Sequence, residues 1–281
     1  MPNSKAVFDQ ILSGITVDDT LNEKRSIAFL ILEHEFGVTK SQIIANSPLK
    51  AFDWQRLDHI ISRVNQHEPI QYILGEQEFY GRIFFVNSSV LIPRPETELL
   101  VETVITFAKQ CRYTTKILDV GTGSGCIPIT LALELPSVDI FATDISKEAI
   151  AVAKTNADKH NVFVSFSVGD IVHDELPDQQ FDVVVSNPPY ITEKEKVKMR
   201  DNVLQYEPHQ ALFVSDEDPL LFYRIIATKA KNHLKTNGLL AFEINEHFGN
   251  EMSQLLGNLG YSSVDVIKDL SGKDRIAKGY K

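Results

Sequence analysis

The feature that most constrains the fold of this chain is an alternation of short apolar segments with amphipathic segments after Lys116. The apolar segments include 'KILDV', 'DIFATD', 'VFVSFSV', 'FDVVVSN' and 'GLLAFEI'. Helical patterns accompany them at Cys126–Leu135, at Ser146–His160, from about Pro219 to Leu234 and at Phe248–Leu259. Strands that alternate with helices form a parallel sheet covered by helices, so we predict an α/β fold. The segments 'YSSVDVIKD' and 'RIAKGYK' have no helix between them, which predicts an antiparallel pair at the end of the sheet.

The earlier part of the chain has a different periodicity, and the change divides the chain into three parts. Residues 1–70 show helical spacing, with apolar side chains on one face at Trp54, Leu57, Ile60, Ile61 and Val64. Residues 71–94 contain 'EFYGRIFFV', in which apolar runs flank a Gly-Arg pair, as is typical of a β-hairpin. We therefore predict a helical domain at 1–70, a β-hairpin linker at 71–94 and the main domain at 95–281.

Composition and charge argue against several classes of protein. The 281 residues carry a net charge of −10, whereas proteins that grip duplex DNA usually present a cationic surface. We therefore expect no direct nucleic-acid partner. The two cysteines, Cys111 and Cys126, lie in unrelated contexts and indicate neither a disulfide framework nor a metal site. The first residues, 'MPNSKAVFDQ', lack a signal-peptide pattern, and no apolar stretch approaches a membrane span. We expect a cytoplasmic protein with no membrane partner.

A glycine-rich segment, 'LDVGTGSGC', follows the first strand of the alternating region and predicts a ligand-binding loop. It contains Gly121, Thr122, Gly123, Ser124 and Gly125. Glycines at this place let the backbone approach a ligand and turn tightly into a helix. The spacing is G-x-G-x-G and not the G-x-G-x-x-G of dinucleotide sites. The alternative is a plain tight turn.

Acidic residues at the strand ends indicate what this loop binds. Asp144 closes the second strand, 19 residues beyond Gly125, where a carboxylate can accept both hydroxyls of a ribose. Asp119 precedes the loop and suits an amino group better than a pyrophosphate. Asp170 ends the third strand, where it can bond an adenine amino group while Ile171 packs on the ring. A solvated turn aspartate is the alternative at Asp170. Together these residues favour S-adenosylmethionine over NAD.

The segment 'VVVSNPPYI' ends a strand that is apolar enough to be buried on both faces. Pro188 and Pro189 cannot continue a ladder of hydrogen bonds, so Asn187 lies where a core strand opens into a stiff loop. In α/β proteins this is a place where ligands bind. The alternative is a proline pair that only terminates the strand.

Taken together, these motifs resemble the Rossmann-like S-adenosylmethionine-dependent methyltransferases that methylate planar amino groups. The nitrogen of such a group is a poor nucleophile because its lone pair is delocalised, so it needs two acceptors that hold both N–H bonds. The resemblance implies that Asn187 offers its side-chain oxygen and Pro188 its backbone carbonyl. It implies that Pro189 stiffens the loop and that Tyr190 stacks on the planar group. No catalytic histidine or glutamate is required.

A more specific resemblance covers almost the full chain. The segments 'PIQYILGEQEFYG', 'VLIPRPETELLV', 'ILDVGTGSGCIPI', 'NPPYI', 'YEP' and 'DRIAKGYK' are similar to those of the release factor glutamine methyltransferases. This family has a class I S-adenosylmethionine methyltransferase domain behind a small helical domain. It methylates the glutamine of the Gly-Gly-Gln motif in class I peptide chain release factors, giving N5-methylglutamine. The resemblance implies this activity, a release factor as partner, a helical domain that docks it, and a monomer. Its functional residues fall on Gly121–Gly125, Asp144 and Asn187–Tyr190.

Two other functions and several departures from the family pattern stay open at this point. A DNA or RNA adenine N6-methyltransferase uses the same chemistry, but the charge of −10 weighs against it. A non-catalytic binding protein is the other alternative. Ile171 stands where the family often has an aromatic residue, and 'EIN' at Glu243–Asn245 stands where a glycine is commoner. Arg94 either faces the cofactor or substrate, or pairs with Glu96 or Glu98.

Overall fold

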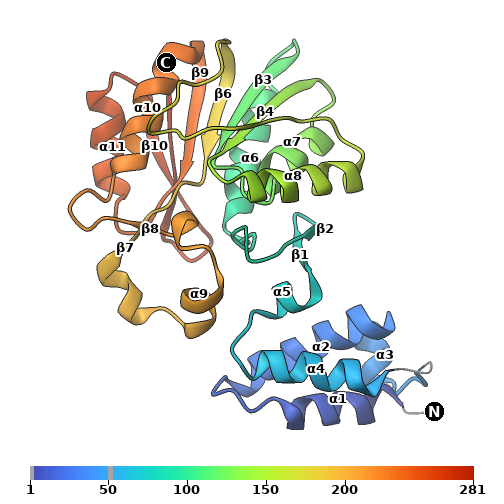
Figure 1. Cartoon of the computed structure of the whole chain (residues 1–281). Coiled ribbons are helices and arrows are strands. Elements are labelled where there is room, and N and C mark those ends of the chain that lie inside the picture. Colours follow the sequence, from blue (N-terminus) through green and yellow to red (C-terminus); the bar gives the residue numbers. More distant parts are fainter. Residues whose placement is uncertain (1–2, 50–52) are drawn as a thin grey trace. The chain divides into compact units, whose positions relative to one another are not determined.

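The computed structural model describes residues 3–49 and 53–281, which form two compact units (Figure 1). The helical unit contains the described residues up to Glu76 together with Arg200–Tyr206. The sheet unit contains Gln77–Met199 and Glu207–Lys281. The helical unit therefore takes a short segment from the second half of the chain, which the three predicted parts did not anticipate.

The helical unit is built from short amphipathic helices around an aliphatic core. Its helices are α1 (Ser4–Gly14), α2 (Leu21–Phe36), α3 (Lys40–Ile44), α4 (Trp54–Val64), α5 (Ile70–Leu74) and α9 (Asp201–Tyr206). Ile11, Ile31, Leu32 and Leu57 are completely buried at its centre. The helical spacing predicted for this region is present at Leu57, Ile60, Ile61 and Val64, which are the buried residues of α4, but Trp54 at the first position of the helix is exposed.

The returning segment is attached to the helical unit by polar contacts. Arg200 lies 2.5 Å from the carboxylate of Glu23, and the Tyr206 hydroxyl donates to the backbone oxygen of Gln66 at 2.8 Å. Glu23 also completes a capping box with Thr20 at the start of α2, which satisfies backbone groups that a helix end otherwise leaves unpaired. The two ends of this short segment are thus each held by a partner far away in the sequence.

The hairpin predicted within 71–94 consists of β1 (Glu76–Phe79) and β2 (Arg82–Phe85), which form a two-stranded sheet. Tyr80 and Gly81 connect the strands with φ angles of 51° and 70°, a left-handed conformation typical of hairpin turns. Phe79 and Phe84 are buried in the same hydrophobic cluster as the central sheet. From Gln77 onward the hairpin belongs to the sheet unit by its packing.

The sheet unit has a seven-stranded sheet in the order β10-β11-β9-β6-β3-β4-β5. The strands are β3 (Thr115–Val120), β4 (Val138–Asp144), β5 (Ser165–Val168), β6 (Phe181–Ser186), β9 (Leu234–Glu243), β10 (Ser262–Lys268) and β11 (Asp274–Tyr280). Neighbouring strands from β5 to β9 are parallel. β11 is antiparallel to both β9 and β10. The predicted α/β fold and the predicted antiparallel pair at the end of the sheet are confirmed.

Helices cover both faces of the sheet (Figure 1). They are α6 (Thr97–Ala108), α7 (Cys126–Glu134), α8 (Lys147–His160), α10 (Leu221–His233) and α11 (Gly249–Asn258). Side chains of a strand alternate between its faces. On β6, Val183 and Val185 therefore join one core cluster, while Val184 joins the other. Because β6 is buried on both faces, its continuous apolar run is explained.

The carboxyl ends of the parallel strands define one edge of the sheet. The chain passes from β3 to β4 on one side, and β6 lies on the other side of β3. This reversal of direction leaves a crevice outside the strand ends, where α/β proteins bind ligands. Two short strands, β7 (Ile191–Thr192) and β8 (Phe213–Val214), and two 3-10 helices, η1 (Glu193–Lys198) and η2 (His209–Ala211), follow β6.

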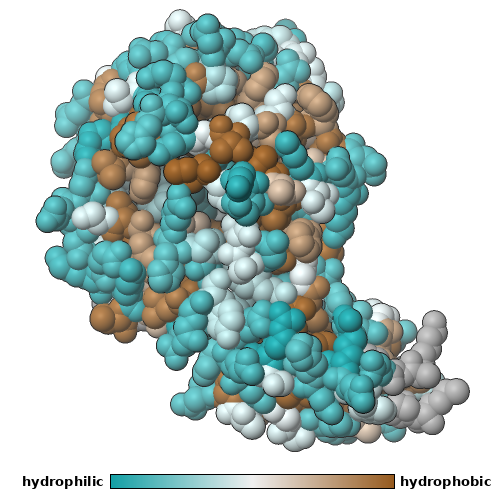
Figure 2. All heavy atoms as spheres, in the orientation of Figure 1, coloured by the Kyte–Doolittle hydropathy of each residue, from teal (hydrophilic) through white to brown (hydrophobic). Residues whose placement is uncertain are grey.

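Among the described residues, no helix is both long enough and apolar enough to cross a membrane. Figure 2 shows hydrophilic residues over most of the visible face of the sheet unit, with hydrophobic residues in smaller groups between them.

Candidate active site

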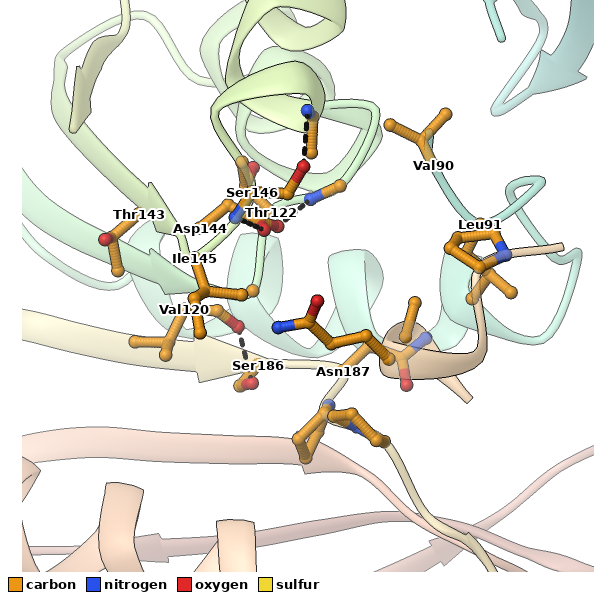
Figure 3. Close-up of a pocket in the computed structure, with 18 of the residues that line it drawn as sticks. Val90, Leu91, Val120, Thr122, Thr143, Asp144, Ile145, Ser146, Ser186 and Asn187 are labelled. Atoms are coloured by element: carbon orange, nitrogen blue, oxygen red, sulfur yellow. Dashed lines mark hydrogen bonds between the residues drawn. The ribbon is translucent and has the colours of Figure 1, made fainter. Parts of the chain in front are cut away.

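A cavity of about 490 Å³ lies at the carboxyl ends of β3, β4 and β6 (Figure 3). This volume is within the range of small-molecule sites. Ten of the residues predicted for the site line it: Gly121, Thr122, Gly123, Ser124, Asp144, Asp170, Ile171, Asn187, Pro188 and Pro189. Two other predicted residues, Gly125 and Tyr190, are not among its lining residues. The structure therefore brings most of the predicted residues around one space.

The glycine loop has a backbone that favours glycine at each of its three glycine positions. Gly121, Gly123 and Gly125 have φ angles of 77°, 54° and 78°, in the left-handed region. At Gly125, a Cβ atom would lie 3.0 Å from Ile129 Cδ1 and 3.1 Å from Ala153 Cβ. Gly125 therefore allows α7 to pack closely against α8, a role that does not require it to line the cavity.

Asp144, at the end of β4, is held in place by backbone donors. Its Oδ2 accepts a hydrogen bond from the backbone N–H of Gly123 at 2.8 Å, and its Oδ1 accepts one from Ser146 at 2.9 Å (Figure 3). Burial raises the pKa of Asp144, and these two hydrogen bonds act in the opposite direction. Each oxygen keeps capacity for one further donor, as two hydroxyls of a ribose require.

Asp170 and Ile171 follow β5 and also line the cavity. One oxygen of Asp170 accepts a hydrogen bond from the backbone N–H of Val172 at 2.8 Å. Asp170 therefore shapes its own turn, which is the alternative considered from the sequence, while it also faces the cavity. Ile171 is partly buried against the second core cluster. An adenine contact at these two residues stays a prediction.

Asp119 lies behind the glycine loop and does not line the cavity. Its side chain is completely buried, and neither oxygen makes a hydrogen bond of ordinary geometry with the described residues. Burial raises the pKa of Asp119 to about 7, an increase that the nearby Thr122 hydroxyl only partly offsets. Its position behind the loop gives no support to a direct contact with a ligand amino group.

Asn187 follows the last residue of β6 at the edge of the cavity. Just before it, the Ser186 hydroxyl donates to the backbone oxygen of Val120 at 2.6 Å, which ties the ends of β6 and β3 together (Figure 3). The amide nitrogen of Asn187 donates to Thr97 Oγ1 at 3.4 Å. Its Oδ1 atom is buried and has no hydrogen-bond partner among the described residues. A buried acceptor without a partner is costly, so it marks a place where a ligand donor can bind.

Tyr190 supports this loop from behind the cavity wall. Its hydroxyl donates to Glu243 Oε1 at 3.0 Å, and its backbone oxygen accepts from the Asn245 side chain at 3.3 Å. Burial and the charge of Glu243 raise the pKa of Tyr190 well above its ordinary value, so the phenol stays neutral. Stacking of this ring on a substrate stays a prediction, because Tyr190 does not line the cavity.

Two residues of this network were missed from the sequence. Glu243 is completely buried at the end of β9, and its Oε2 accepts from Thr97 Oγ1 at 2.6 Å. Burial raises the pKa of Glu243, while the hydrogen bonds from Thr97 and Tyr190 lower it. A glutamate inside the apolar run 'GLLAFEI' was the available signal, since glutamate is rarely buried without a partner. Thr97 lies between Glu96 and Glu98 in 'PETE', and a threonine between two acidic residues gave no signal of a buried hydrogen bond.

The interpretation of Arg94 requires a correction. Arg94 lines the cavity, but its guanidinium pairs with Glu207 at 2.6 Å and not with Glu96 or Glu98. The Glu207 side chain is 1% exposed and also accepts from the backbone N–H of Ile92 at 3.3 Å. The segments 'LIPRPETE' and 'YEP' are therefore joined at the cavity, although they lie far apart in the sequence.

The residues around the cavity fit S-adenosylmethionine. The glycine loop would give such a ligand close access to the backbone, and Asp144 has two oriented carboxylate oxygens of the kind that ribose hydroxyls need. Ile145 and Ile171 add apolar side chains to the lining. Among the described residues, no group of three or more His, Cys, Asp or Glu side chains is arranged to hold a metal ion.

Comparison with known proteins places the two units in described families. The family 'Methyltransferase small domain' matches residues 95–212, and the family 'PrmC N-terminal domain' matches residues 18–75. A release factor glutamine methyltransferase of Flavobacterium psychrophilum is 42% identical over 98% of this chain and 97% of its own. One of Bacteroides thetaiotaomicron is 44% identical over 90% of this chain and 91% of its own. A methyltransferase structure from Pyrococcus furiosus matches with a TM-score of 0.52 at 19% identity, over 78% of this chain and 96% of its own, which supports the fold alone.

Proposed function

This chain belongs to the family of release factor glutamine methyltransferases, and from that premise we propose its activity. It transfers a methyl group from S-adenosylmethionine to the side-chain amide nitrogen of the glutamine in the Gly-Gly-Gln motif of class I release factors. The product is N5-methylglutamine. The observation that carries the site assignment is the buried, unpaired Oδ1 of Asn187 at the edge of the cavity.

The residues of the acceptor end have the chemistry that this reaction needs. A glutamine amide nitrogen shares its lone pair with the neighbouring carbonyl and is a weak nucleophile. We propose that Asn187 Oδ1 and the backbone carbonyl of Pro188 each accept one of its two N–H bonds. Held in this way, the nitrogen directs its lone pair at the methyl carbon. A glutamine amide supplies two donors, so it can satisfy the acceptor that Asn187 leaves unpaired.

When bound, S-adenosylmethionine would supply a methyl group on a positively charged sulfur, and the carbon–sulfur bond would break, leaving a neutral thioether, as the amide nitrogen takes the methyl group. The nitrogen then carries an extra proton, which is strongly acidic and passes to water. We propose that Asp144 binds the ribose hydroxyls and that the loop Gly121–Gly125 approaches the ligand. Asp170 and Ile171 are proposed to contact the adenine.

An assay with three acceptors tests this proposal. The chain is incubated with S-adenosylmethionine and, separately, with an intact class I release factor, a short Gly-Gly-Gln peptide and duplex DNA. We expect mass spectrometry to show one added methyl group on the glutamine of the release factor and none on DNA. Methylated adenine in the DNA would instead support the alternative function of an adenine methyltransferase. Cofactor binding without transfer to any acceptor would support a non-catalytic binding protein.

We also propose that the helical unit docks the release factor and that the chain acts as a monomer. In support, this unit has a hydrophobic core of its own, and the described residues that line the cavity all belong to the sheet unit. A chain shortened to begin at Gln77 should bind cofactor normally but methylate the intact release factor much more slowly. The same shortened chain should methylate the short peptide about as well as the full chain does. Calorimetry of cofactor binding serves as the control that the sheet unit still folds. Full activity on the intact release factor would contradict the docking role.

A further inference from the structure

A chain of hydrogen bonds joins Asn187 to a carboxylate buried beneath it. Asn187 Nδ2 donates to Thr97 Oγ1 at 3.4 Å, and Thr97 Oγ1 donates to Glu243 Oε2 at 2.6 Å. Thr97 is 3% exposed and Glu243 is 0% exposed, so the bond between them is shielded from bulk water, while the bond from Asn187 is partly buried. The second oxygen of Glu243 accepts from Tyr190 at 3.0 Å. Both ends of the segment Asn187–Tyr190 are therefore connected to one carboxylate.

The hydrogen bonds from Asn187 through Thr97 to Glu243 follow one another from donor to acceptor in a single direction. When Glu243 is ionised it can only accept hydrogen bonds, so the single hydroxyl proton of Thr97 is then committed to Glu243. The oxygen of Thr97 can then only accept from Asn187. A carboxamide has one donating end and one accepting end, and only its amino group can satisfy Thr97. With the amino group facing Thr97, Oδ1 must face the other way.

We propose that Thr97 and Glu243 are positioning residues that fix which end of the Asn187 carboxamide is offered to the methyl-accepting nitrogen. This inference rests on the proposed function, because the two N–H bonds of a planar amide need an oxygen and not an amino group. In a flipped carboxamide, the amino group of Asn187 would face the N–H donors of the substrate amide, and Oδ1 would no longer be there to accept from them. The polar partner that selects the correct end belongs to α6 and β9, outside the loop that carries Asn187.

The unpaired state of Asn187 Oδ1 supports this direction. The oxygen has less than 1 Å² of exposed surface and no hydrogen-bond partner among the described residues. If the carboxamide were turned around, its oxygen would meet the oxygen of Thr97, which has no proton left to donate. The orientation with the amino group toward Thr97 thus satisfies one end of Asn187 and keeps its other end available for substrate.

Two substitutions at Thr97 test the proposal. Each variant is made in the full chain and its kcat is measured with intact release factor, at an alkaline pH that favours the ionised form of Glu243. Thr97→Val keeps the shape of the side chain but removes its hydroxyl. Without that hydrogen bond, fewer molecules should hold the Asn187 carboxamide in the correct orientation, so kcat should fall about tenfold. KM for the cofactor and for the release factor should stay within about twofold. Thr97→Ser keeps the hydroxyl and should retain kcat within about twofold.

Thr103→Val is the matched control. Thr103 lies on the same helix, and its hydroxyl donates only to the backbone oxygen of Leu99, at 2.8 Å. This control should leave kcat unchanged within about twofold. A Thr97→Val enzyme within about twofold of wild type, or a Thr97→Ser enzyme as slow as Thr97→Val, would overturn the proposal. If the wild-type chain fails to methylate the release factor at all, the proposed function fails instead, so the two failures are distinguishable.

A second background separates orientation from general support. In Asn187→Asp the two side-chain oxygens are equivalent, so no orientation needs to be selected. Adding Thr97→Val to Asn187→Asp should therefore cost less than about twofold in single-turnover rate, against about tenfold in the Asn187 background. Equal losses in both backgrounds would show that Thr97 only supports the loop and would overturn the proposal. Glu243→Gln, which can donate as well as accept, should lower kcat in the Asn187 background as Thr97→Val does.

Discussion

The two ends of the cavity are built in different ways. At the end that we propose for the cofactor, Asp144 is held by backbone N–H groups of Gly123 and Ser146, which are 21 and two residues away in the sequence. At the end that we propose for the methyl acceptor, Asn187 is held by the side chain of Thr97, 90 residues away, and Thr97 by Glu243, 146 residues away. Backbone donors survive most substitutions, whereas each side chain of the second network can be lost in one step.

The difference has a chemical reason. A carboxylate that binds two hydroxyls has equivalent oxygens, so backbone donors suffice to aim it. A carboxamide has two unlike ends, and a neighbouring group must distinguish them. The acceptor end therefore needs a polar partner whose own hydrogen bonding is determined, and a buried carboxylate provides this. The comparison predicts that single substitutions reduce rate at one end and affinity at the other.

The largest expected effect is at the acceptor end. Asn187→Ala should lower the single-turnover rate of methyl transfer to release factor by about 10²–10³, as removal of one oriented transition-state partner does. Cofactor affinity and melting temperature should change little, because Asn187 lies at a loop outside the core. A rate within about threefold of wild type would mean that this loop does not hold the acceptor nitrogen.

At the cofactor end, Asp144→Asn should weaken S-adenosylmethionine binding by about 10–10², the loss of about one hydrogen bond to a charged group. The new amino group would also face one of the two backbone N–H donors. Calorimetry measures the affinity directly. Asp139→Asn is the matched control, because Asp139 is an exposed carboxylate on the same strand. If Asp144→Asn bound as tightly as Asp139→Asn, the carboxylate would not contact the ribose.

The smallest expected effect compares Asp144 with Asp119, the acid of the same region that lacks backbone donors. The pKa of Asp119 is raised from 3.8 to about 7, so between these values the folded chain holds a proton that the unfolded chain has released. The contribution of Asp119 to stability should therefore be largest below pH 3.8, fall as the pH rises toward about 7, and level off above it.

Asp119→Asn tests this sign. Chemical denaturation near pH 5 and pH 8 should show the unfolding constant of the wild type rising by about 10² more than that of the variant, because about two pH units separate pH 5 from the raised pKa of about 7. The variant should retain cofactor binding, because Asp119 does not line the cavity. Parallel pH profiles for the two proteins would show that Asp119 does not titrate in this range, and would remove the contrast with Asp144.

Much of the molecule was predictable from local pattern. Apolar runs of strand length alternating with helical segments predicted the parallel sheet, because the period of side-chain exposure follows directly from backbone geometry. Boundaries were less accurate: β9 begins at Leu234, four residues before the predicted strand at Gly238. The pairing of β6 with β9 shifts register between Phe181 and Val183. The polar residues 235–237 at the start of β9 gave no strand pattern in the sequence.

That most of the residues proposed for the cofactor line one cavity could also be predicted from sequence. Gly121, Gly123 and Asp144 lie at strand ends, and parallel strands bring those ends to one edge whatever their side chains are. Asn187 could be located for the same reason. The sequence placed Tyr190 next to the site but could not decide whether its side chain faces the cavity, because the direction of a loop side chain depends on what packs around it.

The pairings between side chains that are distant in sequence could be seen only in the folded chain. No periodicity links Thr97 to Glu243, Arg94 to Glu207, or Arg200 to Glu23. A buried charge must find a partner, so the sequence indicates that a partner exists. Which residue it is depends on how the helices pack on the sheet and where a loop returns. Strand-end positions are determined by backbone geometry alone, whereas the orientation of Asn187 is determined by contacts that exist only after the whole sheet unit has folded.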